Sequence, residues 1–469
     1  MTTEVNQVLG LSSDTFSAED SMKSPILTSA ETFIDQSSSS LSTRTLNKFT
    51  LISIIGSALL TGLSLAMIIP VLPKLLLIAV NENSSHAAWI TGTVSFAGSC
   101  VEIFSNPILG RASDRIGRKP ILMLSVLGLL VELLLIGCFY NSVAVYVAAR
   151  MIASLTGVFF VTLNTIYADI AAGTGEEAYT YGVSGASFGV CFVIGPILGG
   201  KLERVHTALA VFASCTLLTL NLFYITFFVP ETNTHSIDPD LHNSSDSFIR
   251  RISKVSPSVS EINPIPSAAK LLQNPVLKWL ALSFMFDGLA GSGLQSIFFL
   301  FANERFGWKS DEVGQFFSVV GLGLLISQGV ITPYFVPLVG DRLIILLGYF
   351  CESIHFLIYA FATTPRILYL GLGVGFLGFC ATPAFKGVVS RQVDPSEQGA
   401  LQGSLASLQT LARPIAPLIS NAVFALFSSK NNGISSFYYF PGAPMIVLAG
   451  FAFIAFFIAI KALSNPKLK

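Results

Sequence analysis

Seven ionisable residues lie inside long apolar stretches of this sequence, where a charge is costly unless it has a partner or faces water. They are Glu102, Glu132, Arg150, Asp287, Glu352, His355 and Arg413. Carboxylates and imidazoles in such surroundings can take up and release protons, and arginines can hold carboxylates or anionic solutes. These residue types predict proton binding, or the binding of a charged solute, within an apolar medium.

The spacing of four of these residues predicts two pairs. Glu132 and Arg150 each lie about nine residues from the turn near Asn141, so both lie about 13 Å along the arms of one helical hairpin. We expect an ion pair in which protonation of Glu132 frees Arg150; the alternative is a permanent structural pair. Glu352 and His355 are three residues apart on one helix face, where they either share a proton or only pack.

The remaining three residues lack an obvious partner along the chain. Asp287 lies in the glycine-rich segment "FMFDGLAGSG" and is a candidate for solute or proton binding. Arg413 precedes Pro414, and its partner is expected to be Asp287 or an anionic group of a solute. Glu102 is a further candidate for proton coupling.

The composition indicates that most of the chain lies in a membrane. Of its 469 residues, 52% are hydrophobic and only 12% are charged, with a mean hydropathy of +0.69, whereas soluble domains carry about 25% charged residues. A helix needs roughly 20 apolar residues to cross a bilayer, and about twelve such runs are present. They lie near 49–72, 88–109, 120–140, 143–166, 181–201, 207–229, 276–301, 313–338, 342–363, 367–388, 400–427 and 440–462. The fourth and tenth runs are interrupted by polar residues.

The runs predict an all-α membrane protein with twelve transmembrane helices in two six-helix bundles. The domains are a disordered Ser/Thr-rich tail (1–46), a first bundle (47–230), a polar linker (231–275), a second bundle (276–464) and a short tail (465–469). Basic residues concentrate on the side of both termini, which predicts that the termini and the linker are cytoplasmic. The protein is expected in the plasma membrane or in an organelle membrane.

A weak internal sequence repeat favours two related halves, as in many transporter folds. Gly128 precedes Glu132 in the third run of the first half, and Gly348 precedes Glu352 in the third run of the second. The segment "PLVGDR" in the second half is a reduced counterpart of "SDRIGRK" in the first.

The loop after the second run, "GRASDRIGRKPIL", resembles the signature motif of the major facilitator superfamily. Its motif residues are Gly110, Asp114, Arg115, Gly117, Arg118 and Lys119. The resemblance implies a cytoplasmic gating loop that latches the two bundles against the eleventh span; the alternative is a solvated loop that only sets topology. Arg150 followed by Gly157 resembles a second motif of the superfamily, with Ser154 in place of a frequent glycine.

The fifth run resembles the antiporter motif of this superfamily. Its motif residues are Gly182, Gly195, Pro196, Gly199 and Gly200, with Cys191 in place of one glycine. The segments "PVLPKLL", "YADI" and "RQVDPSEQGALQGSLASL" are similar to those of the tetracycline-efflux, drug:proton antiporter branch. Two departures are Thr61, where that branch carries an aspartate, and Leu324, near the place of a histidine, so tetracycline is not the expected solute.

The resemblance implies a secondary transporter that moves a small organic solute by alternating access, with proton-coupled antiport of the efflux type. The alternatives are an uncoupled facilitator or proton symporter of a metabolite and, outside transport, a membrane receptor or scaffold. The expected partners are a small-molecule solute, protons and the lipid bilayer, with the protein functional as a monomer.

Other function classes find no support in the residues. The balance of 27 basic and 27 acidic residues shows no nucleic-acid footprint. No catalytic motif predicts an enzyme, and no cofactor is implied. The six cysteines lie in apolar runs and are expected to pack as small hydrophobic residues rather than to bind a metal or form disulfides.

Overall fold

The computed structural model describes residues 49–171, 177–232, 277–392, 405, 408–410, 413–428 and 439–464. The predicted tails, nearly all of the predicted linker and most of "RQVDPSEQGALQGSLASL" lie outside the described residues. The chain divides into two units, Met1–Thr50 and Leu51–Lys469. Everything described below belongs to the second unit, except the first two residues of the first helix.

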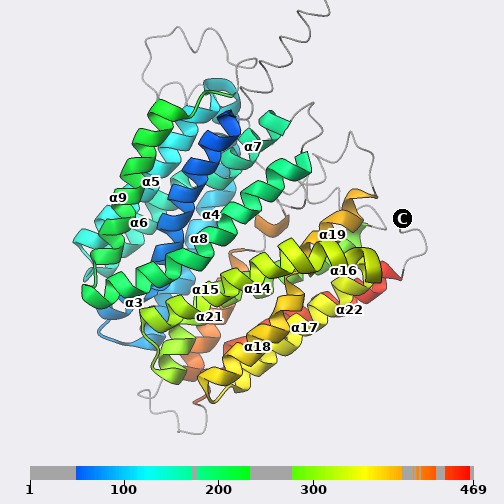
Figure 1. Ribbon diagram of the computed structural model, residues 1–469. Helices are drawn as coiled ribbons and strands as arrows, with labels where there is room; N and C mark the ends of the chain where they lie inside the picture. Colours follow the sequence, from blue (N-terminus) through cyan, green and yellow to red (C-terminus); the bar gives the residue numbers. More distant parts are fainter. Residues whose placement is uncertain are drawn as a thin grey trace, which may run out of the picture. The chain divides into compact units, whose positions relative to one another are not determined.

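The described part of the first half contains six consecutive helical spans. The first span, Phe49–Ala79, turns at Pro70 and continues as α3. The helices of this half are α3 Leu72–Ala79, α4 Ser84–Ile116, α5 Arg118–Cys138, α6 Val143–Thr156, α7 Phe159–Ala171, α8 Glu177–Val205 and α9 Leu209–Phe228. Figure 1 shows them in blue to green.

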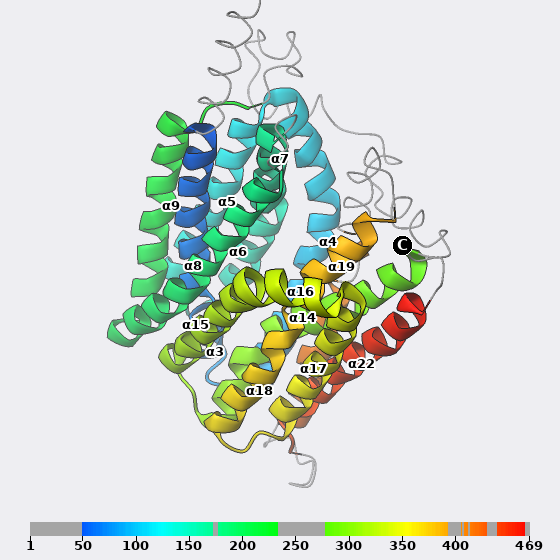
Figure 2. The same cartoon turned by 45° about the vertical axis from the view of Figure 1, so that its right-hand side comes forward.

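The second half repeats this arrangement. Its helices are α14 Leu277–Phe306, α15 Ser310–Ile326, the π-helical η1 Ser327–Ile331, α16 Thr332–Val339, α17 Asp341–Phe361, α18 Pro365–Gly378, α19 Ala381–Ser390, α21 Ile415–Ser428 and α22 Ala443–Leu463. Figure 2 shows them in yellow-green to red. Every regular element among the described residues is a helix.

Ten spans of the described chain are long and apolar enough to cross a membrane. The fifth and eighth predicted spans correspond to α8 and to the continuous helix formed by α15, η1 and α16. The helices agree with the predicted runs in number and order, which confirms the all-α membrane fold. Most helix ends lie within two residues of the predicted bounds, and the largest extensions are at the ends of the first span, at Ala79, and of α4, at Ile116.

The helix ends follow local sequence. Asn83 caps α4 by accepting from the backbone N–H of His86, and Ser142 caps α6 by accepting from Val145. α5 begins directly after Gly117, which has a φ of +116° that side-chain-bearing residues rarely adopt. We call the end at which α5 ends and α6 begins the outer end, and the end at which α4 ends and α5 begins the inner end.

The fourth and tenth spans are both broken, at corresponding places in the two halves. The fourth breaks between α6 and α7 at Gly157, and the tenth breaks between α18 and α19. A Cβ at Gly128 would lie 2.7 Å from Cβ of Thr156, and one at Gly348 would lie 2.6 Å from Cβ of Ala381. The corresponding glycines of the third and ninth spans thus pack against the two breaks, which gives a structural reason for the glycine that the two halves share.

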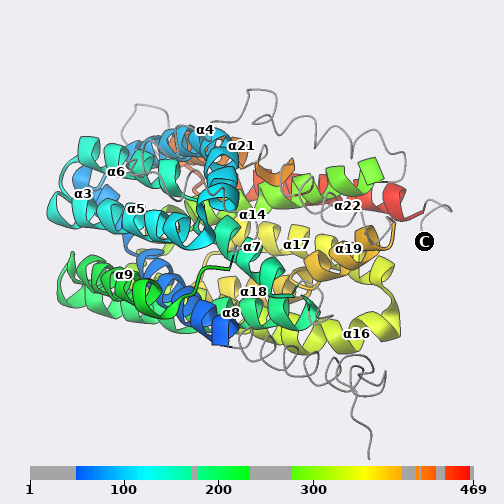
Figure 3. The same cartoon turned by 90° about the horizontal axis from the view of Figure 1, so that it is seen from above.

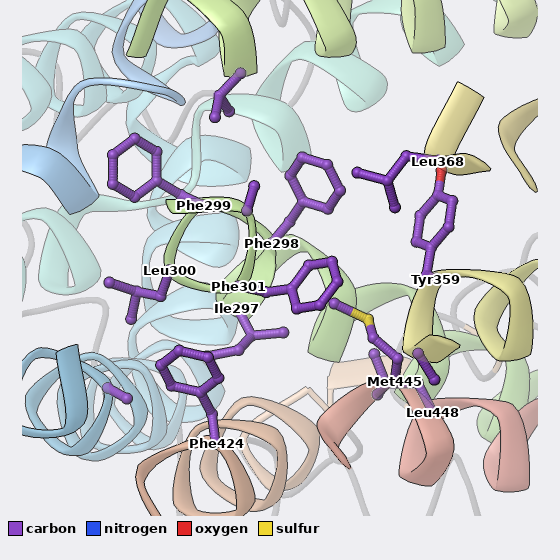
Figure 4. Close-up of a cluster of buried hydrophobic side chains, with 14 of the residues drawn as sticks. Ile297, Phe298, Phe299, Leu300, Phe301, Tyr359, Leu368, Phe424, Met445 and Leu448 are labelled. Atoms are coloured by element: carbon purple, nitrogen blue, oxygen red, sulfur yellow. The ribbon is translucent and has the colours of Figure 1, made fainter. Parts of the chain in front are cut away.

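The two halves pack against each other through α15 on α8 and α21 on α4; Figure 3 shows the second pair side by side. A buried cluster fills the outer end, where residues of the first half such as Leu76 and Ala88 join residues of the second half such as Phe298. Figure 4 shows the aromatic side chains of this cluster gathered around α14. The halves therefore meet at the outer end, which is closed.

Candidate functional site

Glu132 and Arg150 form an ion pair between the arms of the hairpin made by α5 and α6. Nη1 of Arg150 donates to Oε1 of Glu132 at 2.7 Å, at the equal depth that the sequence predicts. The Glu132 side chain is 3% exposed, whereas that of Arg150 is 39% exposed. An arginine at this depth is costly in lipid, and the ion pair with Glu132 offsets that cost.

Glu102 lies between this pair and the second half. A Cβ at Gly157 would lie 3.7 Å from Oε1 of Glu102, so the carboxyl is close to the break of the fourth span. Three charged groups act on it electrostatically, in the order Arg413, Arg150 and Glu132. Its charged neighbours thus include an arginine of the other half, whereas the sequence predicts Asp287 or a solute as the partner of Arg413.

Asp287 of α14 and Glu352 of α17 form the second cluster. Their carboxyl groups lie within hydrogen-bonding reach of each other, and two carboxyl groups can form such a bond only when one of them carries a proton. The hydroxyl of Tyr349 lies close to both. Among the described residues no basic side chain acts on either carboxyl, so this is an acid pair without a cation.

His355 lies against aromatic side chains, which favours the second of the two predicted roles, packing. Its ring is buried against Phe356 and Tyr359, with the Tyr359 centroid at 4.2 Å, and its Nδ1 has no hydrogen-bond partner. Because the carboxyl of Glu352 lies beside that of Asp287 instead, the structure places His355 in a packing environment.

At the inner end, Arg118 is the centre of a charge cluster. Its guanidinium forms an ion pair with Asp114 one turn earlier, and its Nε donates to Oδ2 of Asp169, at the end of the fourth span, at 3.1 Å. The carboxylate of Glu231 accepts the backbone N–H groups of Arg118 at 2.7 Å and Lys119 at 3.0 Å. Glu231 thus caps α5, which begins with two cations that its own helix dipole disfavours.

Asp169 and Glu231 are functional residues of this cluster that the sequence did not predict. Each is more than fifty residues from Arg118 in sequence, and neither belongs to the signature motif of the loop. The predicted contact of this loop with the inner part of the eleventh span involves residues that are partly outside the described chain.

The second half carries a counterpart of this cluster with the charges reversed. Gly340 has a φ of +86° and precedes Asp341, the first residue of α17. Asp341 pairs with Arg391, which follows the last helix of the tenth span. In the first half the arginine stands at the start of the third span and the aspartate at the end of the fourth; in the second half they have exchanged places.

The motif glycines of α8 serve two different contacts. Added Cβ atoms at Gly195 and Gly199 would meet the first span at Ala66 and Met67, within the same half. One at Gly200 would lie 2.5 Å from Cα of Asp311, on α15 of the other half. Pro196 lies inside α8, where its carbonyl faces Gly314 of α15, and Gly182 lies near the inner end, where side chains are outside the described part.

Comparison with known proteins decides the family. The sequence profile of the Major Facilitator Superfamily matches residues 54–417. The chain is a member of this superfamily. It is therefore a multi-pass membrane transporter with a small-molecule substrate rather than an enzyme.

The relatives of this superfamily member include bacterial resistance proteins. The class C tetracycline resistance protein of Escherichia coli is 28% identical over 385 residues, which cover 82% of this chain and 92% of the relative. The class B protein of Escherichia coli is 29% identical over 374 residues, covering 78% and 86%. The Hippocampus abundant transcript 1 protein of Homo sapiens is 24% identical over 357 residues, covering 75% and 69%.

Solved structures of other transporters share the facilitator fold. The human organic anion transporter MFSD10 superposes with a TM-score of 0.63 at 21% identity, covering 88% of this chain and 99% of that one. The nucleoside transporter NupG gives a TM-score of 0.62 at 13% identity, covering 89% and 99%. At these identities the likeness concerns the fold alone.

Proposed function

We propose that this transporter exchanges a small organic solute for protons by alternating access between its two six-helix bundles. The observation that carries the proposal is the acid pair of Asp287 and Glu352, inside the second bundle and without a cation among the described residues. A second negative charge there is strongly disfavoured, so the pair holds a proton until another group neutralises it. A solute that binds beside the pair would replace that proton, which is antiport.

The relationship to tetracycline resistance proteins supports the efflux direction but not tetracycline itself. Thr61 is fully buried and accepts a hydrogen bond from Nδ2 of Asn221 at 2.7 Å. This bond ties the first span to the sixth within one bundle, so Thr61 does not replace the aspartate of that branch as a solute contact. The transported solute is therefore expected to be another organic compound.

The inner cluster around Arg118 supports a gating role. Asp114, Asp169 and Glu231 hold the start of α5 in one geometry, and the proposed latch uses this fixed loop when the inner end closes. The termini and the loop are proposed to face the cytoplasm.

Proton movement in reconstituted vesicles tests the proposal. Proteoliposomes that hold a pH-sensitive dye and an acidic interior are challenged with a panel of organic solutes, with tetracycline as one member. We expect a transported solute to release protons from the vesicles, and Asp287→Asn or Glu352→Gln to abolish the release while Glu203→Gln, at the outer end, preserves it. Solute entry without proton release would establish the facilitator instead, and proton movement in the direction of the solute would establish symport.

A further inference from the structure

The eleventh span carries two polar side chains, Gln409 and Arg413, on one face. The backbone N–H of Arg413 donates to the carbonyl of Gln409 at 2.9 Å, so the two residues are one helical turn apart and their side chains leave the same side of the helix. An amide and a guanidinium within an apolar span need polar surroundings on that side.

On one side, this face meets the first bundle at Glu102. Arg413 acts electrostatically on the Glu102 carboxyl, as does Arg150 of the first bundle. Both side chains retain exposure, Arg413 more than Glu102. Further outward, α4 and α21 are in contact, because a Cβ at Gly92 would lie 3.4 Å from the carbonyl oxygen of Pro417. The interaction of Glu102 with Arg413 thus lies directly inward of the packed part of these two helices.

On the other side, the face meets α14 at Gly288, next to the acid pair. A Cβ at Gly288 would lie 3.5 Å from Nε2 of Gln409, so this amide packs on the backbone of the residue that follows Asp287. Gln409 therefore contacts α14 of the second bundle beside the acid pair, and Arg413 acts on Glu102 of the first.

We infer that Arg413 is a positioning residue with two alternative acidic partners, Glu102 in the first bundle and the Asp287–Glu352 pair in the second, and that it couples protonation to the movement of the bundles. When the pair holds its proton, Arg413 stays on the side of Glu102, on whose carboxyl it acts electrostatically in this structure. When the pair loses the proton, its additional negative charge draws the guanidinium toward Gln409 and Asp287, which releases Glu102.

The physical basis is that a guanidinium remains charged at every relevant pH and attracts a carboxylate strongly in an apolar interior. The charged groups that face it are Glu102 with the neighbouring Glu132–Arg150 pair in the first bundle, and Asp287 with Glu352 in the second. Because Arg150 is already bonded to Glu132, Arg413 is the arginine that can change partner. This inference rests on the proposed proton coupling and specifies how the coupling reaches the other bundle.

The inference is testable with protons as the only ligand. In the full-length chain with its six cysteines replaced by serine, Asn141→Cys and Thr364→Cys place spin labels on exposed outer loops of the two bundles. Pulsed electron resonance in phosphatidylcholine–phosphatidylglycerol vesicles then gives the ratio of outer-closed to outer-open molecules from mildly acidic to mildly alkaline pH. We expect this ratio to change by up to about tenfold per pH unit when one proton is coupled.

The variants separate the inference from the proposed function. Asp287→Asn should remove the pH response because the proton site is lost. Arg413→Gln and Glu102→Gln should each reduce it to less than about twofold per pH unit, the double variant should cause no further loss, and Arg413→Lys should restore it in part. Arg366→Gln, an exposed charge of the outer end, is the control and should respond as the unmodified protein does.

The outcomes are distinguishable. A pH response that persists in both Arg413→Gln and Glu102→Gln, while Asp287→Asn abolishes it, overturns the inference and leaves the proposed function standing. No pH response in the unmodified protein removes the proposed function and the inference together. If Arg413→Gln fails to fold, Glu102→Gln and Arg413→Lys decide the question.

Discussion

Gly110 and Gly117 belong to one sequence motif, but only Gly117 occupies a position that requires glycine. Its φ of +116° lies in the region that other residues rarely adopt, and a Cβ there would lie 2.5 Å from Oε2 and 2.9 Å from Cδ of Glu231. Gly110 lies inside α4 and has nothing within 4 Å of the place of a Cβ. The motif therefore combines one conformational requirement with one position that is open in this structure.

Alanine substitutions should separate these two glycines. Gly117→Ala is expected to lower the unfolding free energy by about 2 kcal/mol through backbone strain and to displace Glu231 from the start of α5. Gly110→Ala should preserve the stability or raise it by up to about 1 kcal/mol, because alanine favours the helix. Thermal unfolding of the two detergent-solubilised variants measures the difference, and equal losses in both would contradict it.

At the scale of residues, the sequence could predict partners only where they are close along the chain. The contact of Glu132 with Arg150 follows from their equal distance to one turn, and the structure places them at 2.7 Å. The partner of Glu352 is on α14, far along the chain. Which residue contacts the Glu352 carboxyl depends on how the helices pack in three dimensions. Closeness along the chain, as for His355, therefore does not predict that residue.

At the scale of elements, α8 uses neighbouring glycines for two partners. Gly199 lies against the carbonyl of Met67 in the first span, whereas Gly200 lies against the backbone of Ser310 and Asp311 in the other bundle. Because backbone atoms cannot rotate away as a side chain can, neither contact tolerates an added methyl group without a shift of a helix.

The substitutions Gly199→Ala and Gly200→Ala should therefore act differently. Gly199→Ala is expected to lower the melting temperature while the ratio of outer-closed to outer-open molecules stays unchanged. Gly200→Ala should favour the outer-open arrangement, because it separates α8 from α15. Distances between spin labels at Asn141→Cys and Thr364→Cys measure the ratio. A shift of equal size in both variants would contradict the assignment of Gly199 to packing within the first bundle and of Gly200 to the contact between bundles.

Apolar runs predicted the helices, but not the irregularities within them. Length and hydropathy set where a span lies, because a bilayer demands them. The π-helical segment η1 depends instead on tertiary contacts: Oγ of Ser327 donates to the carbonyl of Phe376 at 2.8 Å, and Sγ of Cys380 donates back to the carbonyl of Ser327 at 3.5 Å. These bonds join the eighth span to the break of the tenth, and no local sequence pattern predicts them.

For the whole molecule, hydrogen bonds at the outer end link the two bundles. Glu304 of α14 accepts from Oγ of Ser84 in the first bundle at 2.7 Å and from the hydroxyl of Tyr439 in the second at 2.8 Å. Burial raises the pKa of Tyr439 above its usual value, and the neighbouring Glu304 carboxylate raises it further. The hydroxyl therefore keeps its proton through neutral and mildly alkaline pH. An ion pair of Arg204 with Asp311, at 3.3 Å, is a further link between the bundles.

Removing one or the other donor to Glu304 should show which bond governs closure. Ser84→Ala breaks a bond between the bundles and is expected to shift the population ratio toward the outer-open form by about 2- to 10-fold, the value of one net hydrogen bond. Tyr439→Phe breaks a bond within the second bundle and should leave the ratio nearly unchanged. The same label pair provides the measurement, and a larger shift in Tyr439→Phe would refute this assignment.

The reversed ion pairs at the inner ends of the two bundles have a consequence for how the protein is made. Nascent membrane proteins are oriented by where arginine and lysine fall, with little weight given to acidic residues. Arg118 with Asp169, and Asp341 with Arg391, each contribute one arginine to the same face of the membrane. The two arrangements therefore place the same number of arginines on this face. An ancestral half could exchange the arginine and the aspartate of the pair without reversing its orientation in the bilayer.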